Sequence, residues 1–278
     1  MKNIINGLKN HILKDLACIL VSNIPKSVIK NSDDFKCVLI TCFNLGKNPL
    51  GIDEEYLNKR LEIFDKYTFS SINAQTDKDF MWVILLNGKT PQKFKDKMTK
   101  YENSASISIK LVYADNYDNM ISKRQNISNI LNGEFKNYKS KWLLTCRCDN
   151  DDMLAKNYIE KMKENFRPVH NMFIDFTRGY CLNSFENKLN LYKSRSNHFI
   201  GYVEKIYPNT PIKTVYMCNH SFAKDYGYIR RIDNKTYPLW CEVIHETNQI
   251  NQFQGSCADK KYLKYFQEYF ENKMLDNV

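Results

Sequence analysis

The stretch from Lys141 to Leu154 constrains the fold of this chain most, because an apolar run changes there within a few residues into a cluster of charge. The run begins at Trp142–Leu144, has the length of a buried strand, and is followed by Arg147. An amphipathic pattern over 153–165 then predicts a helix. In open α/β sheets, ligands bind at the edge where such strands end. The acidic cluster at this predicted edge consists of Asp149, Asn150, Asp151 and Asp152.

Three carboxylates within four residues repel one another unless a positive charge joins them. Hard oxygen ligands suit Mg²⁺ and Mn²⁺, and such an ion can bridge to a phosphate of a substrate. A second interpretation is that Asp151 or Asp152 caps the helix that follows. The preceding strand and the following helix favour the metal site.

Apolar runs followed by loops and helical patterns recur along the first half of the chain. This alternation predicts a parallel α/β sheet. Buried strands are expected at 37–41, 80–86 and 107–113, and helices at 53–67, from Pro91 onward, and at 118–131.

The second half has fewer helical patterns and more aromatic residues. A strand is expected at 172–176, and shorter extended segments at 187–193, 198–203 and 213–217. Amphipathic patterns at 4–20 and 259–274 predict a helix at each end of the chain. The first of these is basic, and it either lies on an anionic membrane surface or packs on the domain.

Composition limits the partners of the protein. The 278 residues carry 41 Lys and Arg against 31 Asp and Glu, a formal charge of +10, which favours anionic partners such as sugar nucleotides or anionic lipid surfaces. No RNA-recognition or zinc-finger pattern occurs, so we expect no nucleic-acid partner. The nine cysteines show no framework spacing and no secretory signal is evident, which predicts free thiols and a cytoplasmic protein, either free or peripheral at the membrane.

The run Arg147-Cys148-Asp149-Asn150-Asp151-Asp152 resembles the metal-binding D-x-D region of GT-A glycosyltransferases. More narrowly, it resembles a rhamnosyltransferase family whose members carry a similar Arg-x-Asp-Asn-Asp-Asp run. Further segments match the same family in order, and together they span roughly residues 36 to 255. They are Thr41–Asn44, Ser70–Gln75 before Phe80–Trp82, and Trp240–Asn248.

The resemblance implies a GT-A-like (Rossmann-like) mixed sheet flanked by helices, in a single domain with terminal amphipathic helices. The domain would span 35–258, with a nucleotide-sugar half at 35–152 and an acceptor half at 153–258; segments 1–34 and 259–278 would flank it. The implied donor is a dTDP- or UDP-sugar, and the implied acceptor is a glycan or a lipid-linked glycan. If the sugar is rhamnose, the implied donor is the dTDP-sugar and the stereochemical outcome is inversion.

The resemblance also implies a role for several side chains. Manganese or magnesium would be held by Asp149, Asp151, Asp152 and a late histidine, for which we select His245 over His220. Arg147 would contact the sugar or a phosphate, or would hold the acids in place. The other residues expected near the nucleotide sugar are Thr41, Phe43, Asn44, Asp115, Arg124, Asp149 and Asn150.

Inverting transfer needs a carboxylate that takes the proton from the acceptor hydroxyl. Glu242 is the first candidate for this catalytic base, with Asp225, Asp233 and Glu246 behind it. A nucleotidyltransferase is disfavoured because the chain has no phosphate-cradling glycine-rich loop. The alternative from another class is a non-catalytic glycan-binding or scaffold protein with a degenerate GT-A site.

Overall fold

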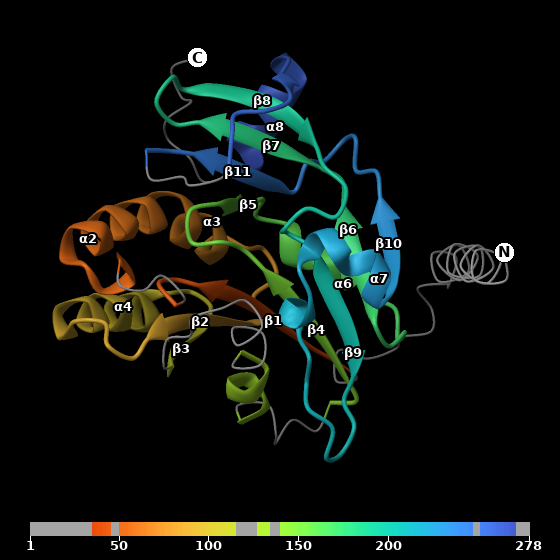
Figure 1. Ribbon diagram of the computed structural model, residues 1–278. Helices are drawn as coiled ribbons and strands as arrows, with labels where there is room; N and C mark the ends of the chain where they lie inside the picture. The colour runs from red at the N-terminus through yellow and green to blue at the C-terminus, as the bar shows by residue number, and fades with distance from the viewer. Residues whose placement is uncertain (1–34, 46–49, 115–126, 134–139, 247–250, 271–278) are drawn as a thin grey trace, which may run out of the picture.

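The computed structural model describes residues 35–45, 50–114, 127–133, 140–246 and 251–270. Within them the chain forms a single α/β domain with two mixed sheets flanked by helices (Figure 1). The mixed α/β fold expected from the sequence is therefore confirmed. The helix expected at 4–20 lies outside the described residues.

The larger sheet carries the acidic cluster. Its strand order is β10-β6-β9-β4-β1-β2-β3. The pairs formed by β1 with β2, β1 with β4 and β2 with β3 are parallel, whereas β9 runs antiparallel to β4 and β6. The strands are β1 (Phe35–Cys42), β2 (Met81–Asn87), β3 (Ser108–Ala114), β4 (Trp142–Arg147), β6 (Met172–Phe176), β9 (Gly201–Lys205) and β10 (Tyr228–Ile232).

The smaller sheet lies above the larger one in the view of Figure 1. Its order is β12-β8-β7-β11-β5, and β11 pairs in parallel with β7 and antiparallel with β5. The strands are β5 (Met153–Leu154), β7 (Arg178–Asn183), β8 (Lys188–Lys193), β11 (Trp240–Ile244) and β12 (Ser256–Cys257).

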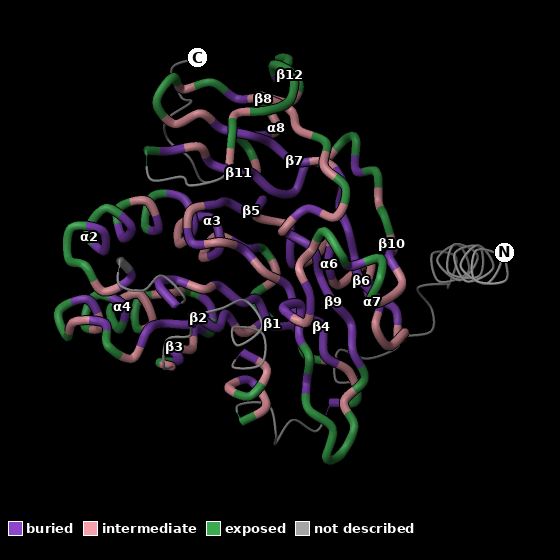
Figure 2. The backbone as a smooth tube through the Cα atoms, viewed as in Figure 1, coloured by how far each residue is buried: buried purple, intermediate pink, exposed green. Residues whose placement is uncertain are grey.

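The central strands are buried on both faces, as Figure 2 shows by their purple colour. In β1, Leu39 packs into one hydrophobic cluster, whereas Val38 and Ile40 pack into the cluster on the opposite face. Side chains alternate between the faces of a strand, and parallel sheets are covered on both sides, so this strand reads as a continuous apolar run.

The helices cover the edges and faces of the two sheets. The side chain of Asp53 caps α2 by accepting a hydrogen bond from the Tyr56 amide at 2.9 Å, and Pro91 immediately precedes α4, as the sequence predicts. Residues 127–133 are helical. The helices are α2 (Glu54–Ile63), a π-helix (Phe64–Phe69), α3 (Ser70–Asn73), α4 (Gln92–Ser104), α6 (Tyr158–Asn165), α7 (Ala223–Tyr226), α8 (Lys260–Tyr269) and three 3-10 helices (Leu50–Ile52, Val215–Met217 and His220–Phe222).

The prediction that a helix starts directly after the acidic cluster is wrong. Met153 and Leu154 instead form β5, and the helix begins at Tyr158. These two residues pair with Cys241 and Trp240 of β11, so a distant strand determines their conformation. The acidic cluster therefore connects a strand of one sheet to a strand of the other.

The extended segment expected at 213–217 is also wrong. Val215–Met217 is a 3-10 helix. The Glu204 carboxylate accepts hydrogen bonds from the amides of Lys213 and Thr214 at 2.9 and 2.8 Å, and Thr214 has a φ of 61°, outside the strand region. These contacts turn the chain where the sequence alone suggests extension.

Candidate functional site

The acidic loop, residues 148–152, follows β4 and is tied to the end of β1. The Thr41 hydroxyl donates a hydrogen bond to the carbonyl of Cys148 at 2.9 Å and accepts one from the indole of Trp82 at 3.0 Å. The side-chain amide of Asn150 donates to the carbonyl of Phe43. Buried hydrogen bonds of this kind fix a loop in one conformation. The backbone of the acidic loop is therefore held by the first strand of the sheet.

The Asp151 carboxylate lies between the side chains of Arg60 and His245. The Arg60 guanidinium, from α2, donates to its carboxylate at 2.7 Å and to the side-chain oxygen of Asn150 at 3.3 Å. His245 Nε2 lies 3.0 Å from the same carboxylate. Burial alone would raise the pKa of Asp151, but the His245 hydrogen bond and the Arg60 charge lower it. Asp151 is therefore an ionised carboxylate with internal partners.

Asp152 is buried and joins three parts of the chain. One carboxylate oxygen accepts the Val243 amide at 3.0 Å, and the other lies 2.8 Å from His198 Nε2. Burial raises the pKa of Asp152 to about 6, against the opposing effect of His198. Burial would lower the pKa of His198, but its hydrogen bond to Asp152 raises it. The Asp152 carboxylate and the His198 imidazole therefore stabilise each other as a buried hydrogen-bonded pair.

Asp149 is the most exposed acid of the loop, with 39% of its side chain accessible. Arg147 donates to both of its oxygens, at 2.8 and 3.1 Å. The guanidinium also lies over the ring of Tyr216, 4.9 Å from its centroid. Burial would lower the pKa of Arg147, but the adjacent Asp149 carboxylate raises it. A buried guanidinium thus faces a carboxylate that solvent and ligands can reach.

Among the described residues, Asp149, Asp152 and His198 are grouped so that a metal ion could bind them. Their candidate ligand atoms all lie within 4.8 Å of one another. Two carboxylates and one imidazole form a donor set that suits Mn²⁺ and accepts Mg²⁺. The side chains present thus fit a divalent cation. Asp151 and His245, which were predicted as metal ligands, form a hydrogen bond with each other.

Glu242, on β11, is the predicted catalytic base. Its carboxyl group lies near enough to the acids of the loop for their charges to affect its pKa. Glu242 is 8% exposed. Burial raises its pKa to about 7; the charges of Asp152 and Asp151 add to this effect, and His198 opposes it. A carboxyl poised near neutral pH is suited to accept and release a proton.

Other predicted residues have different surroundings. The Asn44 side-chain amide donates to the Gly51 carbonyl at 2.7 Å and to the Thr90 hydroxyl at 2.8 Å, so it organises the loop after β1 from a fully buried position. Thr41 and Phe43 are buried as well. Asp115 and Arg124 lie outside the described residues.

The remaining candidate bases lie on the surface. Asp233 pairs with Arg178 at 2.8 Å and with Lys193 at 3.4 Å, and Asp225 is exposed on α7. Glu246 is also exposed, after β11. Glu242 is the candidate base that the structure buries beside the acidic loop.

Two functional residues have no signal in the sequence. Arg60 is a basic residue inside an amphipathic helix, where a solvated charge is the ordinary interpretation. His198 stands before a strand, in a segment that the resemblance does not include. Their contacts with the acidic loop span 91 and 46 residues of sequence. Only the folded chain brings them together.

The fold and site define an α/β protein with an acidic, cation-competent loop at the carboxyl end of a central strand. A family described as putative rhamnosyl transferase matches residues 50–255, which is most of the chain. The chain belongs to this family of glycosyltransferases. The expected family is thereby confirmed.

Comparison with other proteins adds little to this assignment. The crystal structure of HddC from Yersinia pseudotuberculosis is similar at 8% identity, covering 75% of this chain and 89% of that chain, with a TM-score of 0.30. At this TM-score the likeness supports no conclusion about the fold or the function of this chain. A search of the curated proteins finds no match. Among the described residues, we find no helix with the length and apolar character that a membrane span requires.

Proposed function

We propose that this protein is a metal-dependent GT-A-type glycosyltransferase that moves a sugar from a nucleoside diphosphate sugar to a glycan or lipid-linked acceptor with inversion. The observation that carries the proposal is the group formed by Asp149, Asp152 and His198 at the end of β4. Membership of the rhamnosyl transferase family supports rhamnose as the sugar and a dTDP-sugar, ahead of a UDP-sugar, as the donor. The halves 35–152 and 153–258 would serve donor and acceptor.

Asp149, Asp152 and His198 would hold Mn²⁺ or Mg²⁺. When bound, the ion supplies positive charge that stabilises the departing diphosphate. Arg147 supplies a second positive charge, fixed by burial and by its contact with Tyr216. An oriented guanidinium suits phosphate oxygens because it donates parallel hydrogen bonds.

Glu242 would act as the catalytic base. The acceptor hydroxyl oxygen forms a bond to the anomeric carbon, and its proton passes to the Glu242 carboxylate. The bond from the anomeric carbon to the phosphate oxygen breaks, and the nucleoside diphosphate leaves with the bonding electrons. The pKa of about 7 supports this role, because a base is most effective when its pKa is near the working pH.

A second candidate is a non-catalytic glycan-binding or scaffold protein. It is favoured by the internal pairing of the acids: Asp149 with Arg147, and Asp151 with Arg60 and His245. These pairs neutralise the loop without an ion. The two candidates differ in whether the chain releases a nucleoside diphosphate.

The test measures calorimetric binding of dTDP and UDP with and without Mn²⁺, and nucleoside diphosphate release from dTDP-rhamnose and UDP-sugars. We expect Mn²⁺-dependent binding and release, both reduced at least about ten-fold in Asp149→Asn. Asp96→Asn, an exposed position on α4, is the matched control and should equal the parent. Binding that is indifferent to Mn²⁺ and to Asp149→Asn, with no release, would reject the transferase in favour of the scaffold.

The positive net charge supports attachment to an anionic membrane surface from the cytoplasmic side. Sedimentation with vesicles that contain phosphatidylglycerol, compared with neutral vesicles, tests this part of the proposal. Equal partition with both would remove it.

A further inference from the structure

A cavity of about 400 Å³ adjoins the acidic loop, and the mechanism above does not use it. The residues that line it come from α2, the π-helix, the turn between β7 and β8, and the end of β11. His245 lines this cavity, and its Nε2 is also the atom that contacts Asp151. One imidazole therefore separates the cavity from the acidic loop.

Phe185 gives this cavity an aromatic wall that solvent can reach. Phe185 is 57% exposed. A ring that stays exposed contributes little hydrophobic free energy to folding. The turn that carries it is nevertheless fixed: the Asn183 side chain accepts the amides of Phe185 and Glu186 at 3.0 and 3.1 Å, and the Ser184 hydroxyl donates to the Ile244 carbonyl at 2.8 Å. These hydrogen bonds hold the turn in place, so the Phe185 ring stays beside the cavity that it lines.

The charges around the cavity balance one another. Lys59 and Lys66 line it together with Glu62 and Glu246. Equal numbers of basic and acidic groups give no net attraction for an anion or a cation. Their many donors and acceptors, beside an aromatic face, suit a neutral ligand rich in hydroxyl groups. Aromatic faces pack against the apolar faces of sugar rings.

The cavity lies close along the chain to the proposed base. His245 lines it, whereas Glu242, three residues earlier on β11, does not. A ligand that reached both would place different rings on Phe185 and at Glu242.

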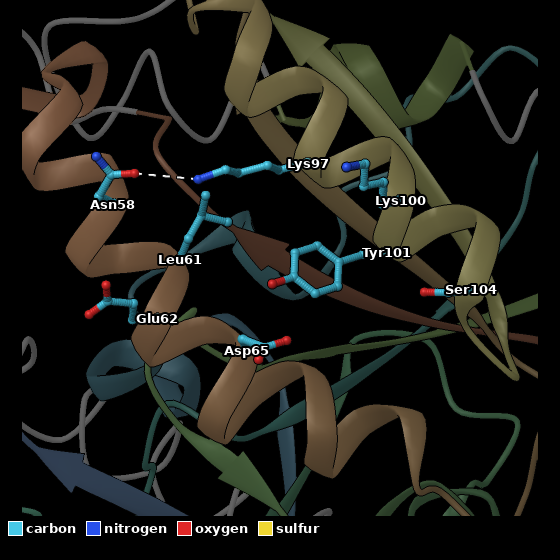
Figure 3. A pocket seen from close by; sticks show the side chains of 8 residues that line it. All are labelled: Asn58, Leu61, Glu62, Asp65, Lys97, Lys100, Tyr101 and Ser104. Carbon is cyan, nitrogen blue, oxygen red and sulfur yellow. Dashed lines mark hydrogen bonds between the residues drawn. The ribbon is translucent and has the colours of Figure 1, made fainter.

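A second cavity, of about 420 Å³, lies between α2 and α4 (Figure 3). Lys97 donates to Asn58 across it at 3.4 Å, and burial together with the nearby Asp65 carboxylate raises the pKa of Tyr101. Tyr101 also packs edge-on against Phe64 in the core, 5.5 Å between centroids. This second cavity is a groove between helices and offers no presented aromatic face.

We infer that the cavity beside His245 binds the body of the acceptor, a neutral oligosaccharide with one ring stacked on Phe185. The identification of this saccharide as the acceptor rests on the proposed transferase function. The proposed binding of a neutral oligosaccharide at Phe185 does not depend on that function and is tested separately.

Saturation-transfer NMR on the full chain tests the inference, with maltotriose, cellotriose and mannotriose as probes. We expect saturation of ring protons in at least one trisaccharide with the parent protein, and a loss of at least five-fold in Phe185→Ala. Tyr207→Ala is the control, because Tyr207 is also an exposed ring, 43% accessible, and follows β9, where it packs against His170. Its signal should equal that of the parent.

Two results overturn the inference: no saturation of any of the three trisaccharides, or equal saturation in Phe185→Ala and the parent. Thermal unfolding of each variant shows that a lost signal is not lost folding. Binding of dTDP with Mn²⁺ to the same samples separates the two proposals. Trisaccharide binding without nucleotide binding would refute the transferase and keep the saccharide site, and the reverse would do the opposite.

Discussion

Arg60→Met is expected to destabilise the fold and to release the acidic loop. Arg60 is 5% exposed and supplies a charge to Asp151 and a donor to Asn150, so methionine keeps much of the apolar volume but removes both contacts. Removing one partner of a buried ion pair costs about 3–5 kcal/mol, because the other charge stays buried. His245 keeps one hydrogen bond to Asp151. We therefore expect Arg60→Met to lower the free energy of unfolding by about 3 kcal/mol, the lower end of this range.

A loss of this size is measurable by urea unfolding followed by circular dichroism. For a domain of about 150–250 residues, 1 kcal/mol lowers the Tm by about 2–4 °C, so Arg60→Met should unfold about 6–12 °C below the parent. Lys59→Met is the matched control on the same helix. Lys59 pairs with Glu55 at 2.9 Å, and both side chains are exposed, at 52% and 80%. An ion pair this exposed contributes little to stability.

The double variant Arg60→Met/Asp151→Asn separates charge burial from packing. Neutralising the stranded carboxylate should recover part of the loss, so the double variant should be less destabilised than the sum of the two single variants. Strictly additive losses would show that Arg60 and Asp151 are not coupled. Equal stability of Arg60→Met and Lys59→Met would refute the reasoning entirely.

Three further outcomes are expected. Thr41→Val should cost about 1–3 kcal/mol in urea unfolding, because it leaves the buried Cys148 carbonyl without its donor; a loss below about 0.5 kcal/mol would contradict this role. Folding raises the pKa of Glu242 from 4.5 to about 7, so its contribution to stability is full below pH 4.5 and is lost as pH rises through about 7. Between these pH values the free energy of unfolding of Glu242→Gln should therefore gain about 3 kcal/mol relative to that of the parent. A difference between the two proteins that does not change with pH would refute the shift. Arg147→Gln should strengthen Mn²⁺ binding to the protein alone, because Asp149 loses its competing partner, and weaken dTDP binding; calorimetry that shows both weakened would contradict the arrangement.

The strands were predictable because their signal is local. β1, β2 and β4 are apolar runs buried on both faces, and the edge strand β3 alternates between buried and more exposed residues; both patterns are present in consecutive residues. β5 was not predictable in this way. Its two residues follow acidic residues and precede a helix, and only the pairing with β11 makes them extended.

The acidic cluster was predictable as a cluster but not in its division of roles. The sequence places Asp149, Asp151 and Asp152 within four residues and gives no reason to treat them differently. Asp149 has its partner nearby in the sequence, at Arg147, but Asp151 and Asp152 acquire theirs from distant segments: Arg60 from α2 and His198 from the segment before β9. Tertiary contacts of this kind leave no periodicity in the sequence.

The pairing of each acid has a consequence for how a cation and a diphosphate would bind. An ion that approached the group formed by Asp149, Asp152 and His198 would compete with Arg147 for the Asp149 carboxylate and with the hydrogen bond between Asp152 and His198. A diphosphate beside Arg147 offers that guanidinium new acceptors and so removes the first competition. Each ligand then improves the site for the other, and their binding free energies are coupled by the same amount in both directions. Because Asp151 keeps Arg60 and His245 throughout, the loop need not move for this exchange. Under the proposed function, Asp149 and Arg147 alone would couple the binding of the cation to that of the nucleotide.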